Sequence, residues 1–247
     1  MDTIRRFFKG PAGIMFIIFV IFNLGQAVIS GEIFHPIQYL LSFVYVLPGI
    51  IIGITVHEFA HAFAAYKLGD NTPKIQGRLS LNPARHIDPI GFVALIFIHF
   101  GWGKPVQVNP YAFKKPRRDN LIVDLAGVVT NFVLAFLLVG LYKWVATSMP
   151  VSMQLAHPAI VSAITNIIYY AIFMNLVLCI FNLIPVPPLD GFGVITEIFN
   201  IRHTSLYQTI YQNGFIILMI LMMFGITTKI ITPLITAAMT LFSNIWF

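Results

Sequence analysis

The chain has 247 residues, of which 58% are hydrophobic and 10% are charged. Soluble domains carry about a quarter charged residues, so this composition excludes an ordinary soluble protein and indicates an integral membrane protein. The net charge of +6 would suit nucleic acid, but twelve of the fifteen Lys and Arg residues lie in three segments, 5–9, 67–85 and 104–118. Segments 25–39 and 146–158 contain none.

This asymmetry follows the positive-inside rule, which places basic segments on the cytoplasmic side. We therefore expect a multi-pass protein of a prokaryotic cytoplasmic membrane, with a cytoplasmic N-terminus and the lipid bilayer as its surroundings. We expect no nucleic-acid partner. The first 30 residues also resemble a signal peptide, with a basic start and a short apolar stretch, but an uncleaved signal anchor is the favoured interpretation.

The first half of the chain predicts two spans and a short hairpin. Residues 12–31 are long enough to cross the membrane outward, and residues 40–68 to return. Residues 69–89 are polar and rich in turn formers, which predicts a cytoplasmic loop. Residues 90–102 are apolar but too short to cross, and both flanks are basic. A re-entrant loop or a membrane-lying hairpin fits this pattern, provided that protein covers its backbone.

The second half begins with a basic, proline-bearing segment, 103–119, and continues with spans at 121–146 and 158–184. Three prolines near 185–188 then end the helix, and residues 192–201 form a short helix. Residues 206–247 hold one long span or two, and we favour two pieces separated near Gly225–Lys229. The fold class is thus an all-α polytopic membrane protein with five to six transmembrane helices and a hairpin, organised as one domain over residues 1–247.

The run His57-Glu58-Phe59-Ala60-His61 lies inside the second predicted span. Histidines at i and i+4 share one helix face, so both imidazoles can bind one Zn²⁺. Glu58 points to the neighbouring face, where it can accept a proton from water at the open coordination position. Ionisable groups inside a membrane span are costly and mark functional sites. The pattern therefore predicts a zinc hydrolase with Glu58 as its general base.

A catalytic zinc ion normally has three protein ligands and a water, so a third ligand is needed. Asp190 follows the inward-running span 158–184, which places it at the cytoplasmic end, at the depth of His57 and His61. Glu197 is a rival that lies further past the span, and Asp124 is another, near the start of its own span.

The pattern resembles the site-2 protease family of intramembrane metalloproteases. The resemblance rests first on His57–His61 and on the run from Asn182 to Gly191, NLIPVPPLDG. Three further stretches resemble small prokaryotic members: GRLSLNP at 77–83, GWGKPV at 101–106, and LAG at 125–127 leading to Asn131. Two departures are Val128, where the family often has proline, and the charge of Asp124.

The resemblance implies one zinc ion per chain, held by His57, His61 and Asp190, with Glu58 as general base and acid. It also implies that the substrates are transmembrane or signal-anchor helices and that residues 90–108 offer a membrane-lying hairpin to them. Asn131 and Asn182 could bind substrate or the developing oxyanion, or could join helices. We favour the substrate role for Asn131, which lies in a family-like stretch, and leave Asn182 evenly divided.

Two alternatives stay open at this point. A membrane-anchored surface metalloprotease would degrade damaged proteins and use Glu197 as its third ligand. A non-enzymatic zinc carrier would also bury His and Asp in its spans, but it needs a polar path on both sides of the site, and the outer halves of these spans are apolar.

Overall fold

The computed structural model describes residues 10–31, 36–98 and 100–247. Within these residues the regular elements are helices, apart from an isolated antiparallel bridge between Ile87 and Gly103. The elements in chain order are α2 (Pro11–Ile29), α3 (Pro36–Lys67), α4 (Thr72–Ile75), η2 (Pro83–Arg85), α5 (Pro89–Ile98), η3 (Pro110–Ala112), α6 (Pro116–Ser148), α7 (Val151–Ala156), α8 (Pro158–Asn182), α9 (Asp190–Phe199), η4 (Ile201–His203), α10 (Ser205–Met223) and α11 (Ile226–Trp246). Many begin at proline, whose missing N–H costs nothing in the first turn.

Six of the described helices are long and apolar enough to cross a membrane: α2, α3 from Leu41, α6, α8, α10 and α11. The prediction of an all-α polytopic membrane protein is therefore confirmed. The C-terminal region forms two helices, as expected, because Gly225 adopts a left-handed conformation with φ of 65° between them. The basic residues Arg5, Arg6 and Lys9 lie outside the described part of the chain.

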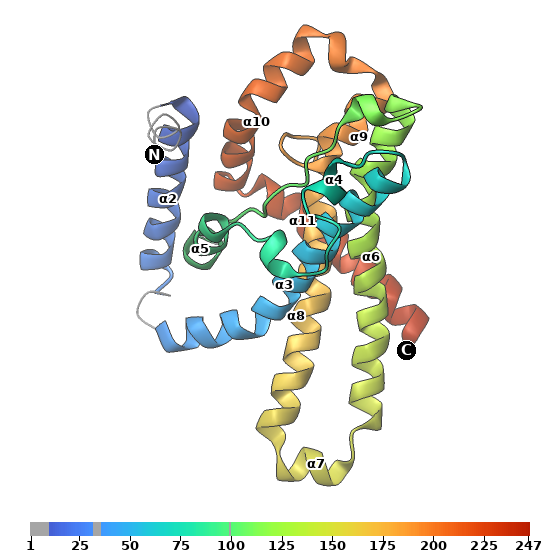
Figure 1. The fold of residues 1–247 in the computed structure, drawn as a ribbon. Helices are drawn as coiled ribbons and strands as arrows, with labels where there is room; N and C mark the ends of the chain where they lie inside the picture. Colours follow the sequence, from blue (N-terminus) through green and yellow to red (C-terminus); the bar gives the residue numbers. More distant parts are fainter. Residues whose placement is uncertain (1–9, 32–35, 99) are drawn as a thin grey trace.

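Three helices, α3, α6 and α8, pack against one another at the centre of the molecule. Figure 1 shows α6 and α8 running side by side and joined by α7 at one end. Close contact between α3 and α8 depends on small residues. A Cβ added to Gly49 would fall 2.7 Å from the Cα of Ala171, and one added to Gly53 would fall 2.6 Å from Cδ1 of Leu178. Gly49 and Gly53 thus allow α8 to pack closely against α3.

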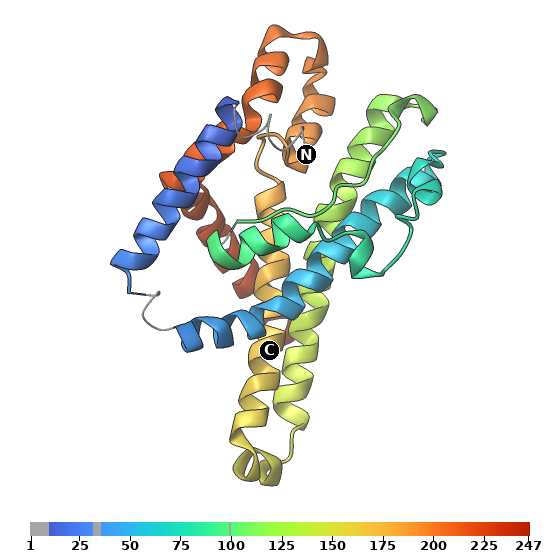
Figure 2. The same cartoon turned by 60° about the vertical axis from the view of Figure 1, so that its left-hand side comes forward.

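The helix α5 has 10 residues and is too short to cross a bilayer. The bridge between Ile87 and Gly103 brings the two ends of this segment together, so the segment forms a hairpin. Figure 2 shows α5 lying between α2 and α3. This arrangement matches the hairpin expected after the HExxH helix.

The elements α4, α9 and the start of α6 lie toward the end of the bundle opposite α7 (Figures 1 and 2). The helix α9 begins at Asp190, two residues before the expected range 192–201. A carboxylate in the first turn interacts favourably with the positive end of the helix dipole, which explains the earlier start. Asp190 is therefore placed by a helix terminus rather than by a loop.

Candidate metal centre

His57 and His61 lie one turn apart on α3, and both are buried, with 5% and 9% of their surface exposed. Their Nε2 atoms are 3.0 Å apart. At this separation the two nitrogens are close enough to bind one common metal ion. The predicted convergence of the two histidines is thus present on a helix that is long and apolar enough to span a membrane.

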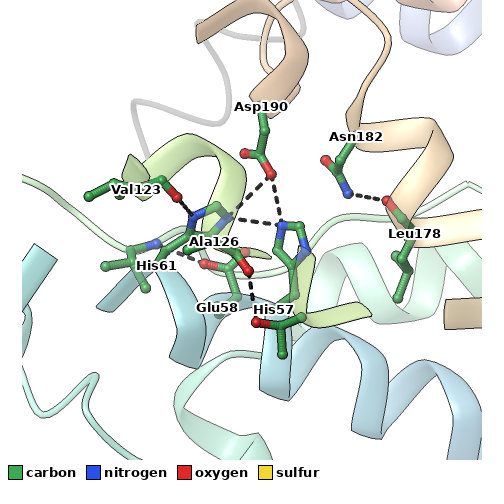
Figure 3. A network of polar contacts seen from close by, with 10 residues as sticks. His57, Glu58, His61, Val123, Ala126, Leu178, Asn182 and Asp190 are labelled. Carbon is green, nitrogen blue, oxygen red and sulfur yellow. Dashed lines mark hydrogen bonds and ion pairs between the residues drawn. The ribbon is translucent and has the colours of Figure 1, made fainter. Parts of the chain in front are cut away.

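Asp190 completes this cluster from α9. Its Oδ2 lies 3.1 Å from Nε2 of His57 and 3.3 Å from Nε2 of His61. Figure 3 shows the carboxylate pointing between the two imidazole rings. Burial alone would raise the pKa of Asp190, but the facing His61 and His57 hold it well below its usual range. The side chain is therefore an ionised acceptor at neutral pH.

The spacing of the three ligand atoms fits a tetrahedral zinc site. Ligand bonds of about 2.0–2.1 Å at tetrahedral angles place the ligand atoms about 3.3 Å apart. The three separations here are 3.0, 3.1 and 3.3 Å. Two imidazole nitrogens and one carboxylate oxygen are also a donor set typical of catalytic zinc. Among the described residues, this is the group of three or more His, Cys, Asp or Glu side chains that could hold a metal ion.

The helix α6 orients His61 through one hydrogen bond and leaves room for both histidine rings at Gly127. Nδ1 of His61 lies 2.7 Å from the backbone oxygen of Val123. A carbonyl accepts only from an N–H, so this contact assigns the proton to Nδ1 and leaves Nε2 for the metal. Gly127 forms the wall beside both rings: an added Cβ would fall 2.6 Å from Cε1 of His57 and 2.6 Å from Nε2 of His61.

Glu58 lies on the neighbouring face of α3, beside the two histidines (Figure 3). It is partly buried, and its Oε2 accepts a hydrogen bond of 3.0 Å from the backbone N–H of Val106. No other hydrogen bond to this carboxylate is found in the described parts of the chain. Oε1 therefore remains as the oxygen that can take a proton.

Neither rival for the third ligand belongs to the cluster. Glu197 lies near the other end of α9 and forms an ion pair with Arg202. Asp124 faces α9 at Gly193, where an added Cβ would fall 2.3 Å from its Oδ2. Glu197 is thus paired with Arg202, and Asp124 packs against the backbone of α9 at Gly193.

The two asparagines lie in different surroundings. The Nδ2 of Asn182 donates to the backbone oxygen of Leu178 at 2.9 Å, close to Asp190 (Figure 3). Asn131 is fully buried, and neither of its amide atoms has a hydrogen-bond partner in the described residues. Asn131 lies one turn beyond Gly127 on the same face of α6.

Several contacts around the site could not be found from the sequence. Val123 and Val106 act through backbone groups, so their residue types do not indicate these contacts. Arg117 donates from Nε to the backbone oxygen of Glu197 at 2.5 Å and from Nη2 to that of Ile198 at 2.7 Å, at the end of α9. In the sequence, Arg117 is visible only as one arginine of a basic segment, and nothing indicates that its partners lie in α9.

Comparisons with known proteins agree with this geometry. The model of peptidase family M50 matches residues 45–225. A Bacillus subtilis protein described as a candidate zinc metalloprotease, YwhC, is 37% identical over 193 residues, covering 78% of this chain and 86% of its own. A Mycolicibacterium smegmatis protein with the same description, Rip2, is 30% identical over 220 residues, covering 86% and 80%.

An archaeal zinc metalloprotease of Methanocaldococcus jannaschii is 24% identical over 215 residues, covering 86% of this chain and 50% of its own. No solved structure gives a significant match. The family match covers more than half of the chain and includes all the residues of the metal cluster. The chain therefore belongs to peptidase family M50, the site-2 protease family of membrane-embedded peptidases.

Proposed function

We propose that this chain is an intramembrane zinc metalloprotease in which His57, His61 and Asp190 hold one zinc ion and Glu58 is the general base. The observation that carries the proposal is the set of three ligand atoms, 3.0–3.3 Å apart, with a carboxylate beside them on a membrane-spanning helix. We further propose that residues 1–247 form a single metalloprotease domain.

Zinc held by His57, His61 and Asp190 would polarise the scissile carbonyl as a Lewis acid and would activate the attacking water. Glu58 takes a proton from the attacking water as the water oxygen bonds to the carbonyl carbon of the peptide bond. When the C–N bond breaks, Glu58 passes the proton to the leaving amine nitrogen. The hydrogen bond from Val106 holds Oε2, so the proton is handled by Oε1.

Asn182 is the proposed polar partner for substrate or for the oxyanion. Its amide has a second N–H besides the one bonded to Leu178, and it lies on the Asp190 side of the site. For Asn131 we keep the proposed substrate role, because the side chain is fully buried and neither of its amide atoms has a hydrogen-bond partner in the described residues. Alanine at either position tests the assignment, because unchanged turnover with a lower melting temperature rejects a role in catalysis.

The proposed substrates are transmembrane or signal-anchor segments. The candidate site lies on a helix that is long and apolar enough to span the membrane, which favours substrates that share the bilayer. A peptide carbonyl inside a helix is already hydrogen-bonded, so the substrate helix must unwind before attack. Glycine or proline near the cleaved bond should therefore increase the rate.

The proposed orientation places the site near the cytoplasmic side of a prokaryotic membrane, with the N-terminus on the same side. The basic segments 67–85 and 104–118 flank the end of α3 that carries His61 and the start of α6. The positive-inside rule supports a cytoplasmic location for that end.

The test is cleavage of a model transmembrane substrate by the detergent-solubilised protein and by Glu58→Gln, with the zinc content of both measured. We expect Glu58→Gln to keep its zinc and to lose about 10²–10⁴-fold in rate, the usual contribution of a general base. Mass spectrometry of the products should place the cut within or beside the apolar segment. Cleavage of soluble unfolded proteins alone would reject the intramembrane assignment.

A further inference from the structure

An extended strip, residues 103–106, crosses the catalytic face of α3. It leaves the hairpin at Gly103, which pairs with Ile87, and the N–H of Lys104 donates to the backbone oxygen of His86 at 2.6 Å. The strip lies directly against α3, since a Cβ added to Gly103 would fall 3.1 Å from Cγ2 of Ile54 and 3.7 Å from Oε1 of Glu58. A displacement of the strip would therefore change the contacts of the Glu58 carboxylate.

The strip reaches the proposed general base through one hydrogen bond. The N–H of Val106 donates to Oε2 of Glu58 at 3.0 Å. This bond selects one orientation of the carboxylate and leaves Oε1 free of the contact with Val106. The position of Val106 is thus part of what orients the base, although its side chain takes no part.

Arg78 holds the strip immediately before Val106. Its Nη1 donates to the backbone oxygen of Lys104 at 3.1 Å, and its Nη2 donates to that of Pro105 at 3.3 Å. Nη1 also donates to the backbone oxygen of Arg85, at the end of its own loop. The planar guanidinium therefore spans two successive carbonyls of the strip and ties them to the loop.

The surroundings of Arg78 indicate more than a surface contact. Arg78 is 8% exposed, and no carboxylate in the described residues forms an ion pair with it. Burial of an unpaired cation is costly, and here only backbone carbonyls offset the cost. A lysine would be a poor replacement, because its single ammonium lacks the rigid fork that reaches two carbonyls at once.

We infer that Arg78 is a positioning residue for the general base: it fixes residues 104 and 105, so that the N–H of Val106 orients Glu58. This inference rests on the proposed role of Glu58. The zinc ligands are held independently, His61 by the backbone of Val123 and Asp190 by its own helix. Loss of Arg78 should therefore lower the turnover rate without removing the metal.

The experiment compares Arg78→Lys and Arg78→Gln with wild type in the full-length, detergent-solubilised protein. Arg85→Gln is the matched control, because Arg85 is an exposed cation of the same loop and only its backbone contacts Arg78. The measurements are kcat and KM on a model transmembrane substrate, zinc content, melting temperature, and hydrogen exchange of the peptide that contains Val106.

Both Arg78 variants should lose about 10–100-fold in kcat, the cost of a catalytic group misplaced by about 1 Å. Their zinc content should stay at the wild-type value, and exchange should increase in the peptide containing Val106 but not in α8. Arg85→Gln should match wild type in every measurement. If Arg78→Gln is unstable, Arg78→Lys keeps the charge and provides the same comparison.

Wild-type kcat in both Arg78 variants would overturn the inference. So would a loss of activity that only parallels a loss of zinc or of folded protein, because Arg78 would then be merely structural. Glu58→Gln in the same assay distinguishes failure of the proposed general base from failure of the role inferred for Arg78. If Glu58→Gln is active, the proposed base is wrong and the inference falls with it; if it is inactive while the Arg78 variants are fully active, only the inference is wrong.

Discussion

Replacement of Gly127 by alanine should selectively damage the metal site. The new Cβ would lie 2.6 Å from Cε1 of His57, 2.6 Å from Nε2 of His61 and 2.7 Å from Nδ1 of His57, whereas ordinary contacts begin at 3.4 Å. The rings must therefore retreat by about 0.8 Å, several times the tolerance of about 0.2 Å for zinc–ligand distances. We expect zinc affinity to fall about 10–100-fold, or about 1.4–2.8 kcal/mol.

The direction of this effect opposes intrinsic helix propensity, which favours alanine over glycine by about 1 kcal/mol inside a helix. Gly25→Ala is the matched control, because it makes the same change in α2, where an added Cβ meets nothing within 4 Å. The assay is competition for zinc with a chelator of known affinity, with circular dichroism to verify the fold. Wild-type zinc affinity in Gly127→Ala would refute the steric reasoning.

Three further predictions concern the placement of α9 and the metal itself. Gly193→Ala should push α9 away from Asp124, because Oδ2 of Asp124 would lie 2.3 Å from the new Cβ. Zinc affinity should fall about tenfold, and adding Asp124→Ala should restore it. A lack of rescue in zinc titrations would contradict the steric cause. Arg117→Ala should lower the free energy of unfolding by on the order of 1 kcal/mol, because the exposed guanidinium donates to carbonyls in the last turn of α9. An unchanged melting temperature would show that this contact contributes nothing to stability. Chelation of zinc should abolish cleavage and lower the melting temperature, because a ligand at a hundred times its Kd stabilises the folded protein by about 2.7 kcal/mol. Added zinc should restore both activity and melting temperature. Activity that survives complete zinc removal would exclude a zinc enzyme.

The spans and the His57–His61 pair of the candidate metal centre could be predicted because their causes are local. The i, i+4 spacing of His57 and His61 follows from helix geometry alone, and long apolar runs predict membrane helices. Asp190 could be proposed by depth, because the predicted spans 40–68 and 158–184 run in the same direction and are expected to end on the same side of the membrane. The division of the C-terminal region followed from Gly225, whose left-handed conformation is accessible to glycine.

The remaining features of the site depend on backbone groups that are distant in sequence. Arg78 and the carbonyls of Lys104 and Pro105 meet only because the hairpin closes between Ile87 and Gly103. In the sequence, Arg78 is simply one of several basic residues in a polar, turn-rich loop. The role of Gly127 is similarly hidden, because a stripe of small residues predicts close packing without indicating that the partner is a pair of imidazoles.

The central claim is that Asp190 is the third zinc ligand of a protease site. The most direct test measures zinc content and cleavage of a transmembrane substrate for Asp190→Ala and Glu197→Ala, prepared alongside wild type. We predict that Asp190→Ala loses both zinc and cleavage, while Glu197→Ala, which breaks only the ion pair with Arg202, keeps its zinc. Full zinc occupancy and activity in Asp190→Ala would contradict the account and place the third ligand elsewhere.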